Sequence, residues 1–358
     1  MSKSTRIIGI DFARTLAIIG MIIVNFKIVL GDGKPVWLKD WLSFFDGKAA
    51  ATFVILAGVG LSLMASKYQT QEARNQFRIT IYKRALFLWI LGLIFYVFWP
   101  ADILHYYGVY LFIAASVIFA SSRLILGLAI VLILGYLILI GSFPYEESWN
   151  FETYEYADFW TWNGFIRHLI YNGFHPVIPW ASFILYGVWL GRQDLRDAYF
   201  VRKAFRLSGM VFLMLQVCSW LMLGLYSDLP SEDYESMRLM FELTPMPPLP
   251  FYMLGGMAIG TFVITGSILL SDRYISKKWV HVIANTGRLA LSIYILHVFL
   301  GMYIVFIIKW EESTGLLSLS AAFIYSLVFG LLAILASNWY LKRKTVGPFE
   351  WLMRKWSS

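Results

Sequence analysis

Long apolar runs alternate with short polar connections from one end of the chain to the other. A helix needs about 20 apolar residues to cross the hydrocarbon core of a bilayer, and runs of this size recur throughout the sequence. The pattern predicts an all-α polytopic membrane bundle of about ten transmembrane helices, with residues 1–358 forming a single transmembrane domain. The predicted spans are 7–30, 48–66, 85–100, 102–120, 124–143, 175–191, 206–226, 250–271, 284–308 and 317–341.

The charges in the connections predict the orientation of these helices. Cytoplasmic loops of membrane proteins carry an excess of Lys and Arg, and here basic and acidic connections alternate. Both termini are therefore predicted to be cytoplasmic. The basic connections hold Lys67, Arg74, Arg78, Lys83 and Arg84, then Arg123, then Arg192, Arg196, Arg202 and Lys203, then Arg273, Lys277 and Lys278. The acidic connections hold Glu146, Glu147, Glu152, Glu155 and Asp158, then Asp228, Glu232, Asp233 and Glu235, then Glu311 and Glu312.

Composition agrees with this pattern, since 59% of the residues are hydrophobic and only 15% are charged. A soluble domain has roughly 45–50% apolar and about 25% charged residues. The net charge of +8 does not indicate a nucleic-acid partner, because the basic residues lie in short loops between apolar runs and follow the topology rule. The acidic and aromatic stretch after residue 143 is either an amphipathic interfacial segment or an aromatic belt.

The first span carries an acidic and a basic residue near its start. Asp11 and Arg14 are three residues apart, which places them on one face of a helix. We expect the two charges to neutralise each other at the membrane boundary.

Ionisable groups at membrane depth mark candidate sites, because they are costly to bury. In the stretch FWPADILHYYG, Asp102 and His105 also share a helix face, so the carboxylate could orient an imidazole that takes a proton. The alternative is that Asp102 only caps the start of its helix. Further groups of this kind on the predicted outer side are Asp46, Lys48 and His175.

Three other polar residues have two interpretations each. His175 precedes a helix with an early proline, so it is either a site residue or an interfacial histidine. His297 lies inside the ninth predicted span and must find a partner within the bundle or stay neutral. Asn25, near the outer end of the first span, is either a helix-to-helix contact or a ligand contact. Neither a metal-ligand spacing nor a phosphate-binding loop stands out, so no metal is expected.

Several motifs together resemble the YeiB-like family of multipass bacterial membrane proteins. They are IDFARTLAIIGMIIVN, FWPADILHYYG and, in a C-terminal signature region over 284–356, TGRLALSIYILH and KRKTVGPFEWLMRKW. That family is distantly similar to the transmembrane acyltransferase clan, which includes the heparan-α-glucosaminide N-acetyltransferases and the acyltransferase-3 proteins. The segment HPVIPWASFILYGVWLGR resembles the Pro-x-x-Pro-Trp helix of the first group.

The resemblance implies a bundle in the bacterial inner membrane, surrounded by membrane lipids and assembled as a homodimer. It implies acyl-CoA, such as acetyl-CoA, as a cytoplasmic donor, and an envelope glycan or lipid as acceptor. Arg14, beside Asp11, would bind the CoA phosphates together with Arg84 and Arg288. The alternative for Arg84 and Arg288 is that they are topology charges.

The sequence departs from the clan at the catalytic histidine. The position on the first helix holds Asn25, and the position in the following loop holds Val36. His105 supported by Asp102 is therefore the expected base, with Asp46 second. The residues expected to bind the acceptor are Asn25, Lys48, His175 and His297. The missing histidine also leaves two other functions open, a transporter or lipid-handling protein that kept the acyltransferase fold and a membrane scaffold.

Overall fold

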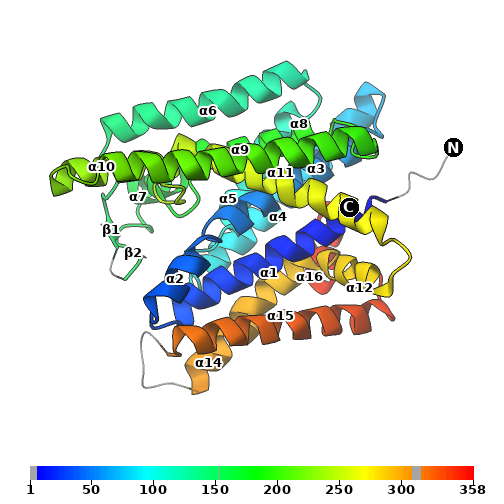
Figure 1. Ribbon diagram of the computed structural model, residues 1–358. Helices are drawn as coiled ribbons and strands as arrows, with labels where there is room; N and C mark the ends of the chain where they lie inside the picture. The colour runs from blue at the N-terminus through cyan, green and yellow to red at the C-terminus, as the bar shows by residue number, and fades with distance from the viewer. Residues whose placement is uncertain (1–5, 152, 309–315) are drawn as a thin grey trace. The chain divides into compact units, whose positions relative to one another are not determined.

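The computed structural model describes residues 6–151, 153–308 and 316–358 (Figure 1). Helices dominate this part of the chain, which contains one antiparallel pair of two-residue strands. The charges predicted at Glu152, Glu311 and Glu312 lie outside the described residues. The first elements are α1 (Ile8–Leu30), α2 (Val36–Ser43), α3 (Lys48–Ala65), α4 (Gln71–Tyr96), α5 (Leu104–Val117), α6 (Ser122–Ser142), β1 (Trp149–Asn150), β2 (Glu155–Tyr156), α7 (Trp162–Arg167) and the π-helix η1 (His168–Asn172). The others are α8 (Val177–Leu190), α9 (Ala198–Leu225), α10 (Ser231–Phe241), α11 (Pro250–Arg273), α12 (Lys278–Gly287), α13 (Ala290–Leu296), the π-helix η2 (His297–Met302), α14 (Tyr303–Ile308), α15 (Leu319–Leu341) and α16 (Pro348–Ser357).

Eight helical segments in the described part of the chain are long and apolar enough to cross a membrane. Helices α5 and α8 are also apolar but have 14 residues each, a length of about 21 Å at 1.5 Å per residue. They correspond to the predicted spans 102–120 and 175–191. The chain is thus a multipass helical membrane protein, as predicted, while the count of ten spans and the orientation of the termini stay predictions.

Several helices extend beyond the predicted spans, because an apolar window detects only the part of a helix that suits lipid. Helix α4 begins at Gln71 rather than at residue 85, and its N-cap Thr70 accepts a hydrogen bond from the Ala73 N–H at 3.2 Å. The predicted span 284–308 is instead divided among α12, α13, η2 and α14.

The contacts group the chain into two compact units, the first of which comprises residues 1–53, 195–206 and 260–352. Within it, α1 packs along α12 and α15 (Figure 1). Gly287 permits this close approach, because a Cβ there would lie 2.0 Å from the backbone oxygen of Asp11. Phe12 packs with Val280 and Ala284 in the core between α1 and α12. Small residues at helix crossings are typical of membrane bundles.

The second unit comprises residues 54–194, 207–259 and 353–358, and it packs α4 along α5 and α6 along α8. Gly92 on α4 permits the first of these contacts, because a Cβ at Gly92 would lie 2.1 Å from the backbone nitrogen of His105. Gly187 on α8 likewise permits a close approach to α3, because a Cβ at Gly187 would lie 2.2 Å from the carbonyl oxygen of Ile55. The first of these two crossings fixes the position of His105 against α4.

The acidic and aromatic connection after α6 folds into a compact segment. It contains the β1–β2 hairpin, in which Trp149 pairs with Tyr156, followed by α7 and η1. Tyr156 and Phe159 are buried, whereas Trp160 and Trp162 are 70% and 79% exposed. The segment therefore packs some of its aromatic rings inward and presents others outward, where an aromatic belt would place them.

Candidate functional site

Asp102 and His105 form a buried pair at the start of α5. The carboxylate Oδ2 lies 3.3 Å from His105 Nδ1, and neither side chain is exposed. The same oxygen accepts backbone N–H groups from Leu104 at 2.7 Å and from His105 at 3.3 Å. Asp102 therefore accepts the backbone N–H groups at the start of α5 and contacts the imidazole at once, which are the contacts that the two interpretations of its role require.

The pair leaves one imidazole nitrogen with an open lone pair. An ionised Asp102 can only accept hydrogen bonds, and His105 Nδ1 then carries the hydrogen toward it. Among the described residues, His105 Nε2 is buried without a hydrogen-bond partner. A carboxylate-oriented imidazole with a free Nε2 is the arrangement that general bases use.

A second histidine, which the sequence analysis did not identify, lies beside this pair. His168 on η1 is fully buried, and its Nδ1 lies 2.8 Å from the hydroxyl of Tyr106, the residue after His105. The rings of His105 and His168 are stacked with centroids 6.1 Å apart. Burial lowers the pKa of His168 well below its ordinary value, and positive charge on His105 or His175 would lower it further. His168 is thus neutral near pH 7.

Aromatic side chains enclose the histidines. The ring of Tyr96 meets His105 edge-on at 5.7 Å and stacks on Phe159 at 3.6 Å. His175, a predicted site residue, is partly buried and meets Trp180 edge-on at 4.6 Å. Its backbone oxygen accepts a hydrogen bond from the Tyr110 hydroxyl at 2.5 Å. Its ring also meets that of Tyr106 at 5.9 Å. The structure thus brings His175 to the His105 cluster, in surroundings of low polarity where each hydrogen bond is strengthened.

Arg167 fixes the segment that carries His168. Its guanidinium binds Glu147 at 2.8 Å and Asp158 at 2.7 Å, and it donates to the Tyr156 hydroxyl at 2.9 Å. Burial raises the pKa of Asp158, but hydrogen bonds from Ser148 and Arg167 outweigh that effect, so the pKa lies below its ordinary value. Arg167 directly precedes η1, so this network sets where His168 points.

The first unit holds the predicted pair of Asn25 and His297. The amide nitrogen of Asn25 lies 2.9 Å from His297 Nε2, and the other ring nitrogen contacts the backbone oxygen of Tyr294. Phe26 stacks on the ring at 6.4 Å. His297 is fully buried, and it has the interior partner that its position in the span required.

Asp46, the second predicted base, is engaged by a lysine. Lys27 Nζ lies 2.6 Å from both carboxylate oxygens and 3.2 Å from the Ser43 hydroxyl. The sequence signal for this pair was a lone lysine near the end of the first apolar run, which the sequence analysis did not use. Lys48 is buried, with its Nζ 5.6 Å from the ring centre of Phe44.

The predicted CoA ligands all have protein partners. Asp11 pairs with Arg14 at 2.8 Å, as predicted, and also with Arg6. Arg84 Nε donates to the Ser357 hydroxyl at 3.1 Å. Arg288 donates to the backbone oxygen of Thr345 at 2.8 Å. In the described part of the chain, no group of three or more His, Cys, Asp or Glu side chains could hold a metal ion.

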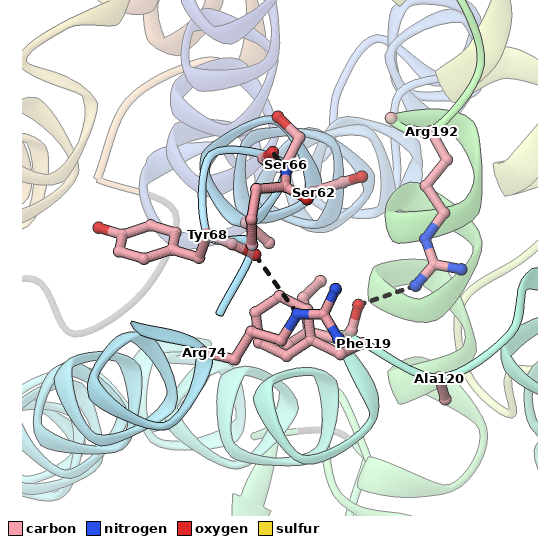
Figure 2. A pocket seen from close by; sticks show the side chains of 11 residues that line it. Ser62, Ser66, Tyr68, Arg74, Phe119, Ala120 and Arg192 are labelled. Carbon is pink, nitrogen blue, oxygen red and sulfur yellow. Dashed lines mark hydrogen bonds between the residues drawn. The ribbon is translucent and has the colours of Figure 1, made fainter. Parts of the chain in front are cut away.

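A pocket of about 370 Å³ lies in the second unit, at the ends of α3, α5 and α8 and the start of α4. In Figure 2 the side chains of Arg74 and Arg192 approach the region of Phe119 from different elements. Arg192 donates to Ser122 Oγ at 2.9 Å and to the Ile118 oxygen at 2.8 Å. The charge pattern along the sequence indicates only a topology role for both arginines.

Two family models match the chain. One is described as "Heparan-alpha-glucosaminide N-acetyltransferase, catalytic" and matches residues 6–217, more than half of the chain. The other is described as "Protein of unknown function (DUF418)" and matches residues 193–358. Together they confirm the resemblance to a YeiB-like family related to transmembrane acyltransferases. A search of curated proteins finds no match. The His105 cluster and the pocket both lie within the first matched region.

Proposed function

This chain belongs to the heparan-α-glucosaminide N-acetyltransferase catalytic family, and from that premise we propose that it transfers an acyl group in a bacterial inner membrane. The donor is acyl-CoA, such as acetyl-CoA, and the acceptor is a hydroxyl or amine of an envelope glycan or lipid. The observation that carries the proposal is the buried Asp102–His105 pair with its open Nε2.

In the proposed reaction His105 acts as general base. Its Nε2 takes the proton of the acceptor while the acceptor oxygen or nitrogen attacks the carbonyl carbon of the thioester. Asp102 holds the Nδ1–H and stabilises the imidazolium that forms. The carbon–sulfur bond then breaks, and the imidazolium returns its proton to the departing sulfur, which leaves as the thiol of CoA. His105 ends in its starting form.

Two features of the cluster suit this chemistry. The aromatic enclosure keeps water away from His105, which limits hydrolysis of the thioester. Tyr106, hydrogen-bonded to the neutral His168, holds its hydroxyl within the same cluster. Because the clan position on α1 holds Asn25, whose amide cannot take a proton at neutral pH, the base in this proposal comes from α5.

The test is transfer of labelled acetyl from acetyl-CoA to envelope glycan and lipid fractions by membranes that contain the protein. We expect labelling with the unchanged protein and its loss with His105→Ala. His281→Ala is the matched control, because His281 is an exposed histidine that contacts the backbone of Ile275. Equal labelling by His105→Ala and the control would exclude His105 as base.

A second function, transport of a small molecule or lipid, is favoured by a different observation. The apolar segment Ala290–Ile308 contains the π-helix η2, and π-turns inside α-helices are frequent at functional sites. Asn25 and His297 would then contact the solute. Uptake or lipid flipping by reconstituted vesicles that is lost in His297→Ala but kept in His105→Ala would favour transport over transfer.

A further inference from the structure

We infer that the pocket at the ends of α3, α5 and α8 binds a phosphate ester. Its volume of about 370 Å³ falls within the usual range of about 300–1,000 Å³ for small-molecule sites. Its lining combines two guanidinium groups, from Arg74 and Arg192, with the aromatic ring of Phe119 and the hydroxyl-bearing side chains of Ser62 and Ser66 (Figure 2).

The positive charge at and beside this pocket has no carboxylate counter-ion in the described part of the chain. Within the described residues, none of Arg74, Arg78 and Arg192 forms an ion pair with a carboxylate. Arg192 uses two of its nitrogens on neutral oxygens, and burial lowers its pKa below the ordinary value. A partly buried cation that lacks an anion is costly. A bound anion would offset that cost.

The aromatic ring of Phe119 contacts two arginine side chains. The guanidinium carbons of Arg74 and Arg78 lie 5.1 Å and 5.2 Å from the centre of this ring, which is a cation–π distance. Both guanidinium groups therefore contact the Phe119 ring, and of the two arginines Arg74 also lines the pocket. Arg78 Nε is buried without a hydrogen-bond partner among the described residues. Planar guanidinium groups bind phosphate oxygens through two parallel hydrogen bonds.

Two sources of a phosphate ester fit this pocket. The arginines belong to connections that the charge pattern predicts to be cytoplasmic, where the nucleotide part of acyl-CoA and the headgroups of anionic lipids are both available. The first source rests on the proposed function, and the second does not. The pocket offers the donor phosphates a place other than Arg84 and Arg288, which already donate to Ser357 and Thr345.

The experiment is calorimetric titration of the full-length protein in detergent with CoA and with pantetheine, which lacks the phosphates. A parallel arm measures retention of phosphatidylglycerol against phosphatidylcholine by native mass spectrometry. The variants are Arg74→Gln and Arg192→Gln, with Arg123→Gln as the matched control. Arg123 is an exposed arginine one residue after Ser122 and does not line the pocket. Thermal unfolding of each variant identifies any loss of fold.

We expect CoA or phosphatidylglycerol to bind, pantetheine not to bind, and each pocket variant to weaken binding about tenfold while Arg123→Gln leaves it unchanged. Retention of both ligands at the original affinity by folded Arg74→Gln and Arg192→Gln proteins would overturn the proposal. The same holds if neither ligand binds the unchanged protein. CoA binding at this pocket without any acetyl transfer would support the phosphate site and contradict the proposed function, so the two failures are distinguishable.

Discussion

His105 in the second unit and His297 in the first are both fully buried histidines, but their hydrogen bonding differs. His297 has a partner at each ring nitrogen, Asn25 at Nε2 and the Tyr294 oxygen at Nδ1. Among the residues that the structure describes, His105 has a partner only at Nδ1, and that partner is a carboxylate. A histidine with both nitrogens satisfied holds helices together, whereas one with an oriented Nδ1 and an open Nε2 can take a proton.

Asp102→Asn gives the largest expected effect short of removing the histidine. Asparagine still accepts the backbone N–H groups of Leu104 and His105 and caps α5, but it carries no charge to stabilise an imidazolium. We expect acetyl transfer to fall roughly 100-fold while thermal unfolding changes little. A protein with full transfer activity would reduce Asp102 to a helix cap.

Gly92→Ala tests the contact that positions His105. The added methyl would lie 2.1 Å from the His105 backbone nitrogen, so α4 and α5 must separate. We expect the free energy of unfolding to decrease by about 1–3 kcal/mol, and acetyl transfer to decrease together with the folded fraction. Gly127→Ala on α6 is the control, because a Cβ there meets nothing within 4 Å. Unfolding in a graded denaturant series measures the free energy of unfolding of the two variants. Equal values for Gly92→Ala and Gly127→Ala would contradict the close contact between α4 and α5.

His297→Gln tests the histidine whose two ring nitrogens both have partners. The change removes the ring that joins Asn25 to the Tyr294 oxygen, so we expect a stability loss of about 1 kcal/mol. Against the acceptor-binding role that the resemblance implies for His297, acetyl transfer per folded molecule should stay unchanged, since both of its ring nitrogens have protein partners. Transfer measured against the folded fraction checks this, and an activity loss that exceeds the loss of fold would assign His297 a chemical role.

The smallest effect concerns pH. The pKa of His168 lies well below its ordinary value of 6.5 in the folded protein, so the unfolded chain binds a proton that the folded chain does not. The free energy of unfolding should therefore fall as the pH decreases below about 6.5. His168→Asn removes this group, so the free energy of unfolding of the variant should depend less steeply on pH between 6.5 and 5. Identical slopes for the two proteins would show that His168 is not kept neutral by the fold.

Local spacing accounts for what the sequence could predict. The apolar runs indicated a multipass helical protein, and the three-residue spacings of Asp11 with Arg14 and Asp102 with His105 placed each pair on one helix face, where the structure confirms the contacts. Contacts between residues that are far apart in the sequence could not be predicted from it. His168 meets Tyr106 across 62 positions, through a connection whose fold depends on the Arg167 network rather than on any periodic pattern.

The sequence did not predict the helix ends or the contacts between distant residues, for related reasons. The polar start of α4 lies outside any apolar window, so the predicted span began too late. The contact of Asn25 with His297 joins positions 272 residues apart, and only packing of α1 against η2 brings them together. Lys27 could have been noticed as an ionisable group in an apolar run, but nothing local indicated that its partner is Asp46.

The most direct measurement compares the catalytic efficiency of acetyl transfer from acetyl-CoA in folded His105→Ala and His297→Ala proteins, prepared side by side in the same lipid. If the open Nε2 of His105 is the base, kcat/KM falls at least about 100-fold in the first protein and keeps its original value per folded molecule in the second. The reverse pattern, with activity lost in His297→Ala and retained in His105→Ala, would contradict this account.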